Sequence, residues 1–373
     1  MRTVFRPLFL CLALLFGSPD TRAQDAERMQ FEDDAEAASP ISWFLDGQAR
    51  YERTEDIPGR ADTLDRARLR LRTGIIWTGE SGLEVGAAVK AQLASSDNRQ
   101  TLANNDNEQS DDTRLDQAWL RWNFAETGSL TLGKAALPLE LSPLTWDADL
   151  RPIGASARIS LPVGDYHAWH FNFGYFAPDH LYDDDSRLAA LQLGFGWNEG
   201  APTSAGVLVS WLDFSDLESL IDGGLGRTNR RVLVPAAGRI QFVSDYRLLD
   251  LQVFGRTQLG DSGDWPLEMR LDYVRNSGAD DLDEGVRGSV LLGDARDGGW
   301  EFGFAYQRAQ RDAVLAAYSE DDWWFHSFAR GGMPWLGYGF DSHWRLRLAA
   351  FRERRDGVAQ ETDRLLLDVH TNW

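Results

Sequence analysis

The segment RARLRLRTG, from Arg66 to Gly74, carries an arginine at every second residue, with alanine and leucine between them. Successive side chains of a β-strand point to opposite faces, so this spacing predicts a strand with one basic face and one apolar face. On a helix the same four arginines would spread over more than half of the circumference. Two architectures accept such a strand: a soluble sheet whose leucines face a core, and a membrane barrel whose leucines face lipid.

The amino terminus has the pattern of an exported protein. Two arginines precede an apolar run, Leu8 to Phe16, and a small-x-small cleavage site ends at Ala23. This pattern predicts a secretory signal peptide over residues 1–23, followed by an acidic periplasmic tail over residues 24–41. The single cysteine, Cys11, lies within the signal, so we expect no thiol or disulfide chemistry in the mature protein.

The composition narrows the choice between the two architectures. A formal net charge of −20 makes nucleic acid an unsuitable partner. After the signal, no apolar run approaches the about 18 residues of a transmembrane helix. Fifteen tryptophans and 35 glycines in so acidic a chain are unusual for a soluble enzyme, but they are ordinary for a barrel with aromatic residues at the lipid interface.

Alternation of apolar and polar residues recurs from about residue 42 to the final residue. Segments such as LEVGAAVKAQL (83–93) and WEFGFAYQR (300–308) have the length of a membrane-spanning strand, about ten residues, and end in turn-forming residues. A single helical turn is expected between Asp216 and Ile221. The pattern predicts sixteen strands, roughly at residues 42–53, 65–77, 82–95, 114–125, 129–135, 155–162, 166–177, 187–197, 204–214, 245–257, 265–276, 285–293, 298–310, 327–340, 343–353 and 361–373.

The connections between these segments alternate in length. Short ones, such as TGES at 78–81 and VGD at 163–165, are followed by longer ones, such as 96–113 and 215–244. Short periplasmic turns and long extracellular loops are typical of outer-membrane barrels. The predicted fold is therefore an all-β, antiparallel transmembrane barrel of about sixteen strands over residues 42–373.

Tryptophan placement gives a second indication of a barrel. If the amino terminus is periplasmic, odd strands begin and even strands end at the periplasmic rim, where an aromatic girdle belongs. Seven of the fifteen tryptophans fall at such positions, although tryptophan also favours strands in general. The predicted girdle consists of Trp43, Trp77, Trp197, Trp265, Trp300, Trp344 and Trp373.

In a barrel, the leucines of the segment 66–72 must face lipid, because an arginine at the bilayer midplane costs about 2–4 kcal/mol. The arginines then face the enclosed water, and inward positions on neighbouring strands extend this surface. Glu52 and Asp368 fall on the same face and neutralise part of it. The predicted channel-lining basic wall consists of Arg50, Arg66, Arg68, Arg70, Arg72, Arg345, Arg347 and Arg364.

The third long connection, residues 136–154, follows a short strand and is a candidate constriction loop. If it folds inward, it carries Glu140, Asp147, Asp149 and Arg151 into the lumen, with the carboxylates facing the basic wall. A transverse field across a water-filled constriction orients dipolar solutes and favours polar permeants. The alternative is that this connection stays outside as an acidic surface loop.

The carboxyl terminus, LLLDVHTNW (365–373), places alternate apolar residues on one face and ends on an aromatic residue. It resembles the β-signal that the barrel-assembly machinery recognises. The expected partners are that machinery, outer-membrane lipid, lipopolysaccharide and small hydrophilic solutes, and a homo-oligomer is left open.

No cofactor and no metal are predicted. His167 and His170 are three residues apart on a strand and point to opposite faces, so they are poorly placed as metal ligands. The acidic runs 183–185, 280–281 and 320–322 are interpreted as solvated loop tips, although such runs also bind Ca²⁺ or bridge to lipopolysaccharide through divalent ions.

The sequence contains no GxSxG, phosphate-binding or zincin signature, so no catalytic residue is predicted. An outer-membrane hydrolase with Ser, His and Asp scattered over several strands is the enzymatic alternative. A non-conducting adhesin barrel would carry a plug or a large passenger domain, and the sequence has neither.

Three segments, LDQAWLRW (115–122), TLGKAALPLELSPLTWDADLRPIGAS (131–156) and DAVLAAYSEDDW (312–323), resemble the putative-porin family of Gram-negative outer-membrane barrels. More loosely, the arginine-rich strand and the GK segment are similar to the alginate-export family. The resemblance implies a channel and leaves the solute open. The predicted function is a general or weakly anion-preferring porin for small hydrophilic solutes; the alternative is a specific channel that exports or imports an anionic saccharide.

Overall fold

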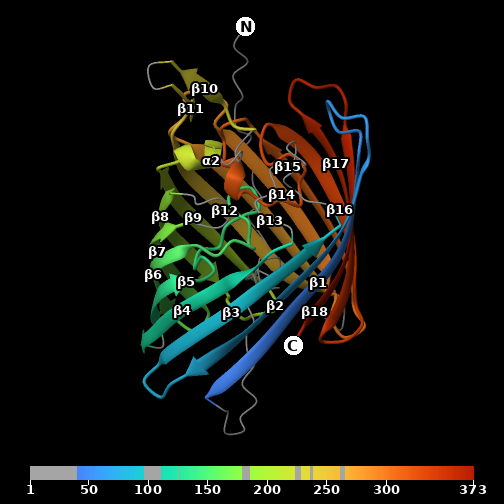
Figure 1. The fold of residues 1–373 in the computed structure, drawn as a ribbon. Helices are drawn as coiled ribbons and strands as arrows, with labels where there is room; N and C mark the ends of the chain where they lie inside the picture. The colour runs from blue at the N-terminus through green and yellow to red at the C-terminus, as the bar shows by residue number, and fades with distance from the viewer. Residues whose placement is uncertain are drawn as a thin grey trace.

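The computed structural model describes residues 40–95, 111–125, 127–178, 185–222, 228–235, 238–260 and 265–373. Within these residues, sixteen antiparallel strands form one closed barrel, in which the first strand pairs with the last (Figure 1). The predicted fold class is therefore confirmed. The predicted signal peptide and residues 24–39 of the predicted tail lie outside the described residues.

Every predicted strand is present, and its ends differ from the prediction by two residues or fewer. The barrel strands are β1 (Ile41–Glu55), β2 (Leu64–Thr78), β3 (Leu83–Ala94), β4 (Thr113–Ala125), β5 (Gly128–Lys134), β6 (Ile153–Val163), β7 (His167–Ala177), β8 (Arg187–Trp197), β9 (Ser204–Ser215), β12 (Tyr246–Leu259), β13 (Trp265–Asn276), β14 (Glu284–Gly293), β15 (Trp300–Ala309), β16 (Ala329–Gly339), β17 (Trp344–Arg355) and β18 (Thr362–Asn372).

The connections divide the barrel into a short-turn end and a long-loop end, the latter drawn at the top of Figure 1. The long connection between β9 and β12 contains the expected helical turn, α2 (Glu218–Asp222). It also contains a hairpin of β10 (Arg231–Val234) and β11 (Arg239–Phe242), which the sequence did not predict. Each hairpin strand has four residues, too few for a period of two to stand out.

The period of two places apolar side chains outside and polar ones inside. On β2, Leu69 and Leu71 are 51% and 43% exposed, whereas Arg66 and Arg72 are buried. The seven tryptophans of the predicted girdle are all exposed, and they lie at the short-turn end because neighbouring strands are antiparallel. No helix among the described residues is long and apolar enough to cross a membrane.

Two long connections pack inside the barrel, and the hydrophobic core lies between them and one side of the wall. They are the β5–β6 loop (135–152), visible within the barrel in Figure 1, and the β15–β16 loop (310–328), which contains the 3₁₀ turn η2 (Ala316–Tyr318). Trp146 stacks on Tyr318 at 5.4 Å between ring centres, and Phe214 of β9 stacks on the same tyrosine at 5.4 Å. Fully burying a large apolar side chain contributes about 1.5–3 kcal/mol, so these contacts hold both loops in the lumen.

Candidate channel constriction

The arginines of β2 face the barrel interior together with inward residues of β1. In the β1–β2 register, Arg50 lies opposite Arg68 and Glu52 lies opposite Arg66. The arginine side chains differ in exposure, which is 16% for Arg68 and 12% for Arg70 but 0% for Arg66. Only some members of the predicted basic wall are therefore within reach of a solute.

The buried carboxylate of Glu52 binds arginines of the predicted basic wall that solvent does not reach. Glu52 Oε2 accepts hydrogen bonds from Arg66 Nη2 at 2.8 Å and Arg364 Nη2 at 3.1 Å, and Oε1 accepts one from Arg68 Nη1 at 3.1 Å. Arg364 Nη1 also donates to the carbonyl oxygens of Asp321 and Asp322 in the β15–β16 loop. Arg66 and Arg364 are thus buried, and Arg364 anchors this loop, contrary to the prediction that both line the channel.

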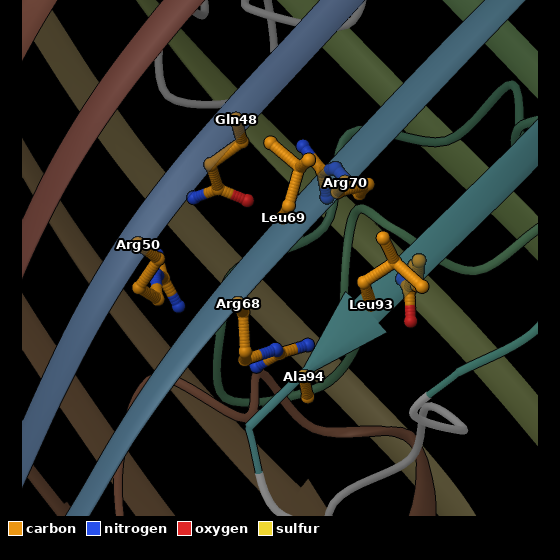
Figure 2. A pocket seen from close by; sticks show the side chains of 8 residues that line it. Gln48, Arg50, Arg68, Leu69, Arg70, Leu93 and Ala94 are labelled. Atoms are coloured by element: carbon orange, nitrogen blue, oxygen red, sulfur yellow. The ribbon is translucent and has the colours of Figure 1, made fainter.

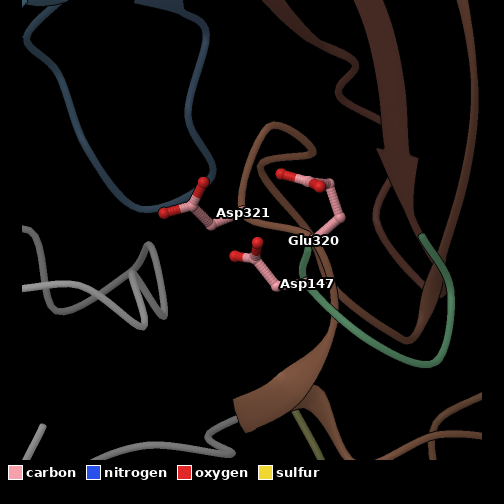
Figure 3. A group of neighbouring side chains, drawn as sticks. All are labelled: Asp147, Glu320 and Asp321. Carbon is pink, nitrogen blue, oxygen red and sulfur yellow. The ribbon is translucent and has the colours of Figure 1, made fainter. Parts of the chain in front are cut away.

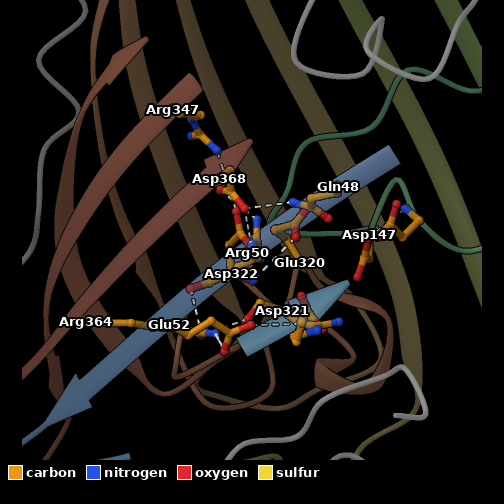
Figure 4. A network of polar contacts seen from close by, with 12 residues as sticks. Gln48, Arg50, Glu52, Asp147, Glu320, Asp321, Asp322, Arg347, Arg364 and Asp368 are labelled. Carbon is orange, nitrogen blue, oxygen red and sulfur yellow. Dashed lines mark hydrogen bonds and ion pairs between the residues drawn. The ribbon is translucent and has the colours of Figure 1, made fainter. Parts of the chain in front are cut away.

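A second group of charges lies beside this carboxylate (Figure 4). Arg50 Nε donates to Asp368 Oδ1 at 2.5 Å, and Arg50 also pairs with Asp322 of the β15–β16 loop. Arg347 of β17 lies 3.8 Å from Asp322, with its guanidinium 5.4 Å from the Trp335 ring. The basic face is therefore matched by carboxylates that come from both the wall and a loop.

Arg345 and Arg72 are two further members of the predicted basic wall. Arg345 faces His370 across β17 and β18. Arg72 is nearly buried and its Nε lies 2.8 Å from Asp116 of β4. Arg72 is thus held in the wall by an ion pair, which leaves it little contact with lumen water.

The β5–β6 loop places its predicted constriction residues in different surroundings. Asp149 pairs with Arg70 and lies 3.8 Å from Arg72. Glu140 is bonded through its backbone carbonyl to Gln192 and Gln252 on the far side of the barrel, at 2.8 and 3.1 Å. Among these residues, it is Asp149 that meets the basic face.

The remaining two residues of the predicted constriction serve the loop itself. Arg151 Nη1 donates to the carbonyl oxygens of Ala148 and Leu150, so it closes the end of the loop. Asp147 Oδ1 accepts the backbone N–H of Asp149 at 2.7 Å, and the backbone N–H of Asp147 donates to the Tyr318 carbonyl at 2.6 Å. Asp147 is thereby turned toward the β15–β16 loop.

A small cavity lies beside the accessible arginines (Figure 2). Figure 2 shows the side chains of Gln48, Arg50, Arg68 and Arg70 grouped around it. The lining is completed by Leu69, Gln92, Leu93 and Ala94. Leu69 and Leu93 are 51% and 62% exposed on the outer face, so this cavity lies within the wall of β1, β2 and β3, bordered by the arginine side chains.

The β15–β16 loop is the part of the site that the sequence interpretation missed. Residues 312–319 and 323–327 are all buried, and the backbone N–H groups of Trp324 and Phe325 donate to Glu353 of β17 at 2.8 and 3.1 Å. The acidic run 320–322 is therefore not a solvated loop tip, and that interpretation was wrong. The signal was present in the apolar residues on both sides, AVLAAY and WWF, which need a buried environment.

Three carboxylates from the two loops converge in the lumen (Figure 3). One oxygen from each of Asp147, Glu320 and Asp321 lies within 4.8 Å of the others. The loops are joined here by the backbone N–H of Glu320, which donates to the Pro143 carbonyl at 3.0 Å. Like charges at this distance disfavour simultaneous ionisation.

The protonation of Glu320 follows from these surroundings. Burial raises the pKa of the Glu320 carboxyl well above its usual range; the charges of Asp322, Asp321 and Asp149 raise this pKa further, while Arg50 opposes the rise. The folded protein therefore holds a proton that the unfolded chain releases above its ordinary pKa of about 4.3. The contribution of this proton to the free energy of unfolding is therefore fully present at acidic pH, and it is lost as the pH rises toward the raised pKa.

Glu320→Gln is expected to remove part of this pH dependence, because the amide stays neutral at every pH. The urea midpoint of the wild type in detergent should fall between pH 5 and pH 9, and that of the variant should fall less. Asp280→Asn removes the same charge from an exposed loop and serves as the control. If the urea midpoint fell equally with pH in the wild type and in Glu320→Gln, the Glu320 carboxyl would be ionised over this whole pH range.

One polar group in the lumen bears on the hydrolase alternative. Ser160 Oγ lies 3.0 Å from His170 Nδ1, and Glu199 Oε1 lies 2.6 Å from His170 Nε2. A serine hydrolase also needs donors for an oxyanion, commonly including the amide of the nucleophile. The Ser160 amide instead donates to the Thr127 carbonyl at 2.7 Å, so we interpret the group as a polar contact between strands.

Comparison with known proteins decides the family. A sequence profile described as putative porin matches residues 33–231, which is more than half of the chain. The chain belongs to the putative-porin family. No curated protein matches the sequence.

Solved outer-membrane porins share the fold of this porin. OprB of Pseudomonas putida is 11% identical with a TM-score of 0.59, over 89% of this chain and 94% of that one. OmpF of Salmonella typhi, solved with daunomycin, is 12% identical with a TM-score of 0.55, over 89% and 97%. A loop-deletion mutant of OmpT of Vibrio cholerae is 13% identical with a TM-score of 0.52, over 90% and 100%.

These findings confirm the predicted recognition, outer-membrane location and channel function of this porin. Family and fold point to a channel rather than an enzyme. The looser resemblance to the alginate-export family gains no support, because the matching profile is the porin one.

Proposed function

We propose that this porin conducts small hydrophilic solutes by passive diffusion, with a weak preference for anions. The observation that carries this proposal is the set of partly exposed arginines that faces the two inward loops. The side chains of Arg68, Arg70 and Arg347 are 16%, 12% and 20% exposed. A solute that passes this constriction meets guanidinium groups on one side and carboxylates on the other.

The expected preference is weak because all three of these arginines have anionic neighbours. Arg70 is paired with Asp149, Arg68 with Glu52, and Arg347 lies near Asp322. Such a lumen has a strong local field but little net potential, which favours polar solutes of either sign over apolar ones.

The double variant Arg68→Ser/Arg70→Ser is expected to shift the reversal potential toward cation preference. A unit charge about 8 Å from a permeant ion in water contributes about 0.5 kcal/mol. Pairing with Asp149 and Glu52 and screening by salt reduce the summed effect of the two arginines, so the anion-to-cation permeability ratio should fall by about two-fold or more. The measurement is reversal potential in planar bilayers under a KCl gradient. Arg53→Ser/Arg352→Ser, which changes exposed arginines on the outer face, is the control. An unchanged reversal potential would contradict a role of these arginines in selectivity.

The alternative is a specific channel in which the same arginines bind the carboxylates of an anionic saccharide. A general pore conducts steadily in plain KCl and is not blocked by any one sugar acid. Current block by a uronate oligomer at micromolar concentration, with relief in Arg68→Ser/Arg70→Ser, would favour the specific channel. The arginine pairing described above favours the general pore, because paired arginines are less available to a ligand.

We further propose that the long-loop end is extracellular and that β18 is the strand the barrel-assembly machinery recognises. In support, β18 closes the barrel: the backbone groups of Trp373 and Leu45 exchange hydrogen bonds at 2.8 and 2.9 Å. One structural neighbour, OmpT of Vibrio cholerae, was solved in a trimer form with a TM-score of 0.50 to this chain. Self-association of this porin remains a proposal.

A further inference from the structure

Three arginines stand side by side on the outer face of β15, β16 and β17. Arg308 lies directly opposite Arg330, and Arg330 lies directly opposite Arg354. The inward neighbours Gln307, Ala309 and Glu353 are buried, which places the three arginines on the outside. Like charges directly opposite one another destabilise a sheet, so this arrangement needs a compensating anion.

The described part of the chain provides no ion pair for these three residues, which we call the arginine row. Other outward arginines at the long-loop end do have carboxylate partners. Arg275 lies 2.9 Å from Asp283, and Arg352 lies 2.8 Å from Asp363. Arg53 lies 2.6 Å from Glu55. The arginine row is thus an exception to the pairing at this end.

Three carboxylates on the two sides of the arginine row contact other residues. Glu284 at the start of β14 accepts a hydrogen bond from the Tyr273 hydroxyl at 2.8 Å. Glu361 and Asp363, beside β17, lie within 3.7 and 2.8 Å of Arg352. Within the described residues these carboxylates do not pair with the row, so the row is open to an anion from another molecule.

The depth of the row in the membrane can be estimated along β15. Arg308 is eight residues from Trp300 at the short-turn end, about 27 Å along a strand and about 21 Å across the membrane at the usual tilt. The apolar band of such barrels is about 25 Å tall. The backbone at Arg308 therefore lies about 4 Å inside the far edge of this band. A long arginine side chain can extend from there to the level of the lipid headgroups, where its charge costs little.

The surface below the row is apolar. Phe304 and Tyr306 on β15 are 46% and 45% exposed, and Leu336 on β16 is 36% exposed. Gly332 lies opposite Tyr306 in the register and has no side chain to cover this surface. Acyl chains can lie against these residues while a headgroup contacts the arginines.

We propose that the arginine row binds the phosphate groups of a lipid A molecule in the outer leaflet. Guanidinium groups bind phosphate through paired, charge-assisted hydrogen bonds, and a phosphorylated disaccharide presents several acceptors along a line of arginines. The apolar surface below would receive the acyl chains. A second copy of this chain is disfavoured, because Glu55, Asp283 and Asp363 at this end already lie beside arginines of their own chain. The proposal rests on the extracellular placement of the long-loop end proposed above.

The test compares two triple variants that lose the same charge. Arg308→Gln/Arg330→Gln/Arg354→Gln removes the row, and Arg53→Gln/Arg275→Gln/Arg352→Gln removes paired arginines of the same end. Delipidated protein in detergent is titrated with purified lipid A, and native mass spectrometry counts the bound lipid. Loss of the row should weaken binding by about ten-fold or more, and the control should bind like the wild type. Equal loss in both variants would overturn the proposal.

Three further binding measurements identify the ligand. Lipid A from which the phosphates have been removed should bind the wild type about as weakly as lipid A binds the row variant. Phosphatidylglycerol or inorganic phosphate that competes as well as lipid A would overturn the assignment to lipid A. The single variant Arg330→Gln supplies the same comparison if the triple variant does not fold.

Conductance of the same preparations separates this proposal from the channel function. The row variant should conduct like the wild type, because its substitutions lie on the outer face. A wild type that binds lipid A but carries no current would overturn the channel proposal and leave the lipid site standing.

Discussion

Glu52→Ala is expected to destabilise the barrel by about 3–5 kcal/mol, the cost of breaking a buried ion pair by removing one partner. The side chain of Glu52 is 1% exposed, and those of Arg66 and Arg364 are 0% and 1% exposed. Removing the carboxylate leaves these buried guanidinium groups uncompensated. Urea unfolding in detergent, followed by tryptophan fluorescence, gives the difference in stability.

Glu55→Ala on the same strand is the matched control. Glu55 pairs with Arg53, and the two side chains are 43% and 47% exposed, so solvent screens the interaction and little change is expected. Equal unfolding midpoints for the wild type and Glu52→Ala would contradict the structural role assigned to this carboxylate. A conductance change in Glu52→Ala is also expected, since Arg364 binds both Glu52 and the β15–β16 loop.

Shortening the β15–β16 loop is expected to raise the single-channel conductance by about two-fold or more, since conductance through a water-filled pore grows with its narrowest cross-section. In this variant a short Gly/Ser linker replaces residues 313–325. This segment includes Tyr318, Trp323 and Trp324, which are at most 2% exposed inside the barrel. Planar-bilayer recording in KCl measures the effect.

Removal of the β10–β11 hairpin is the control for this experiment. Strands β10 and β11 lie at the long-loop end (Figure 1), and the exposed fraction of Leu233 is 61%. Conductance should stay at the wild-type value in this control. Unchanged conductance in the variant with the shortened β15–β16 loop would show that this loop does not limit the pore.

The strands of this porin could be predicted because the alternation of apolar and polar residues in each strand depends only on what lies on its two faces. Over residues 66–74 of β2, both leucines face the outside and all four arginines face the inside, so these nine residues show the period of two clearly. The same holds for β15, where Trp300, Phe302 and Phe304 alternate with inward residues. Lipid on one side and water on the other impose this contrast without reference to any distant residue.

The partners of the arginines could not be predicted in the same way. Glu52 and Arg364 are 312 residues apart in the sequence, and the contact between them forms because β1 and β18 close the barrel. Arg50 and Asp322 meet because a loop folds back into the lumen. The sequence interpretation found the face on which each arginine lies, but it treated too many of them as accessible.

The arginine row also has one feature that the sequence predicts and one that only the tertiary structure decides. Alternation placed Arg308 on the outer face of its strand, as the pattern of β15 requires. Its position beside Arg330 and Arg354 depends on the register of three strands, which is set by turns and by loop packing.

The sequence by itself determined the strands, the direction in which each side chain points, and the membrane location, because these depend on local alternation between lipid and water. The tertiary structure decided which arginines remain accessible and which loops fill the lumen. Those outcomes depend on barrel closure, and closure brings together charges that lie hundreds of residues apart, where their desolvation must be balanced by pairing.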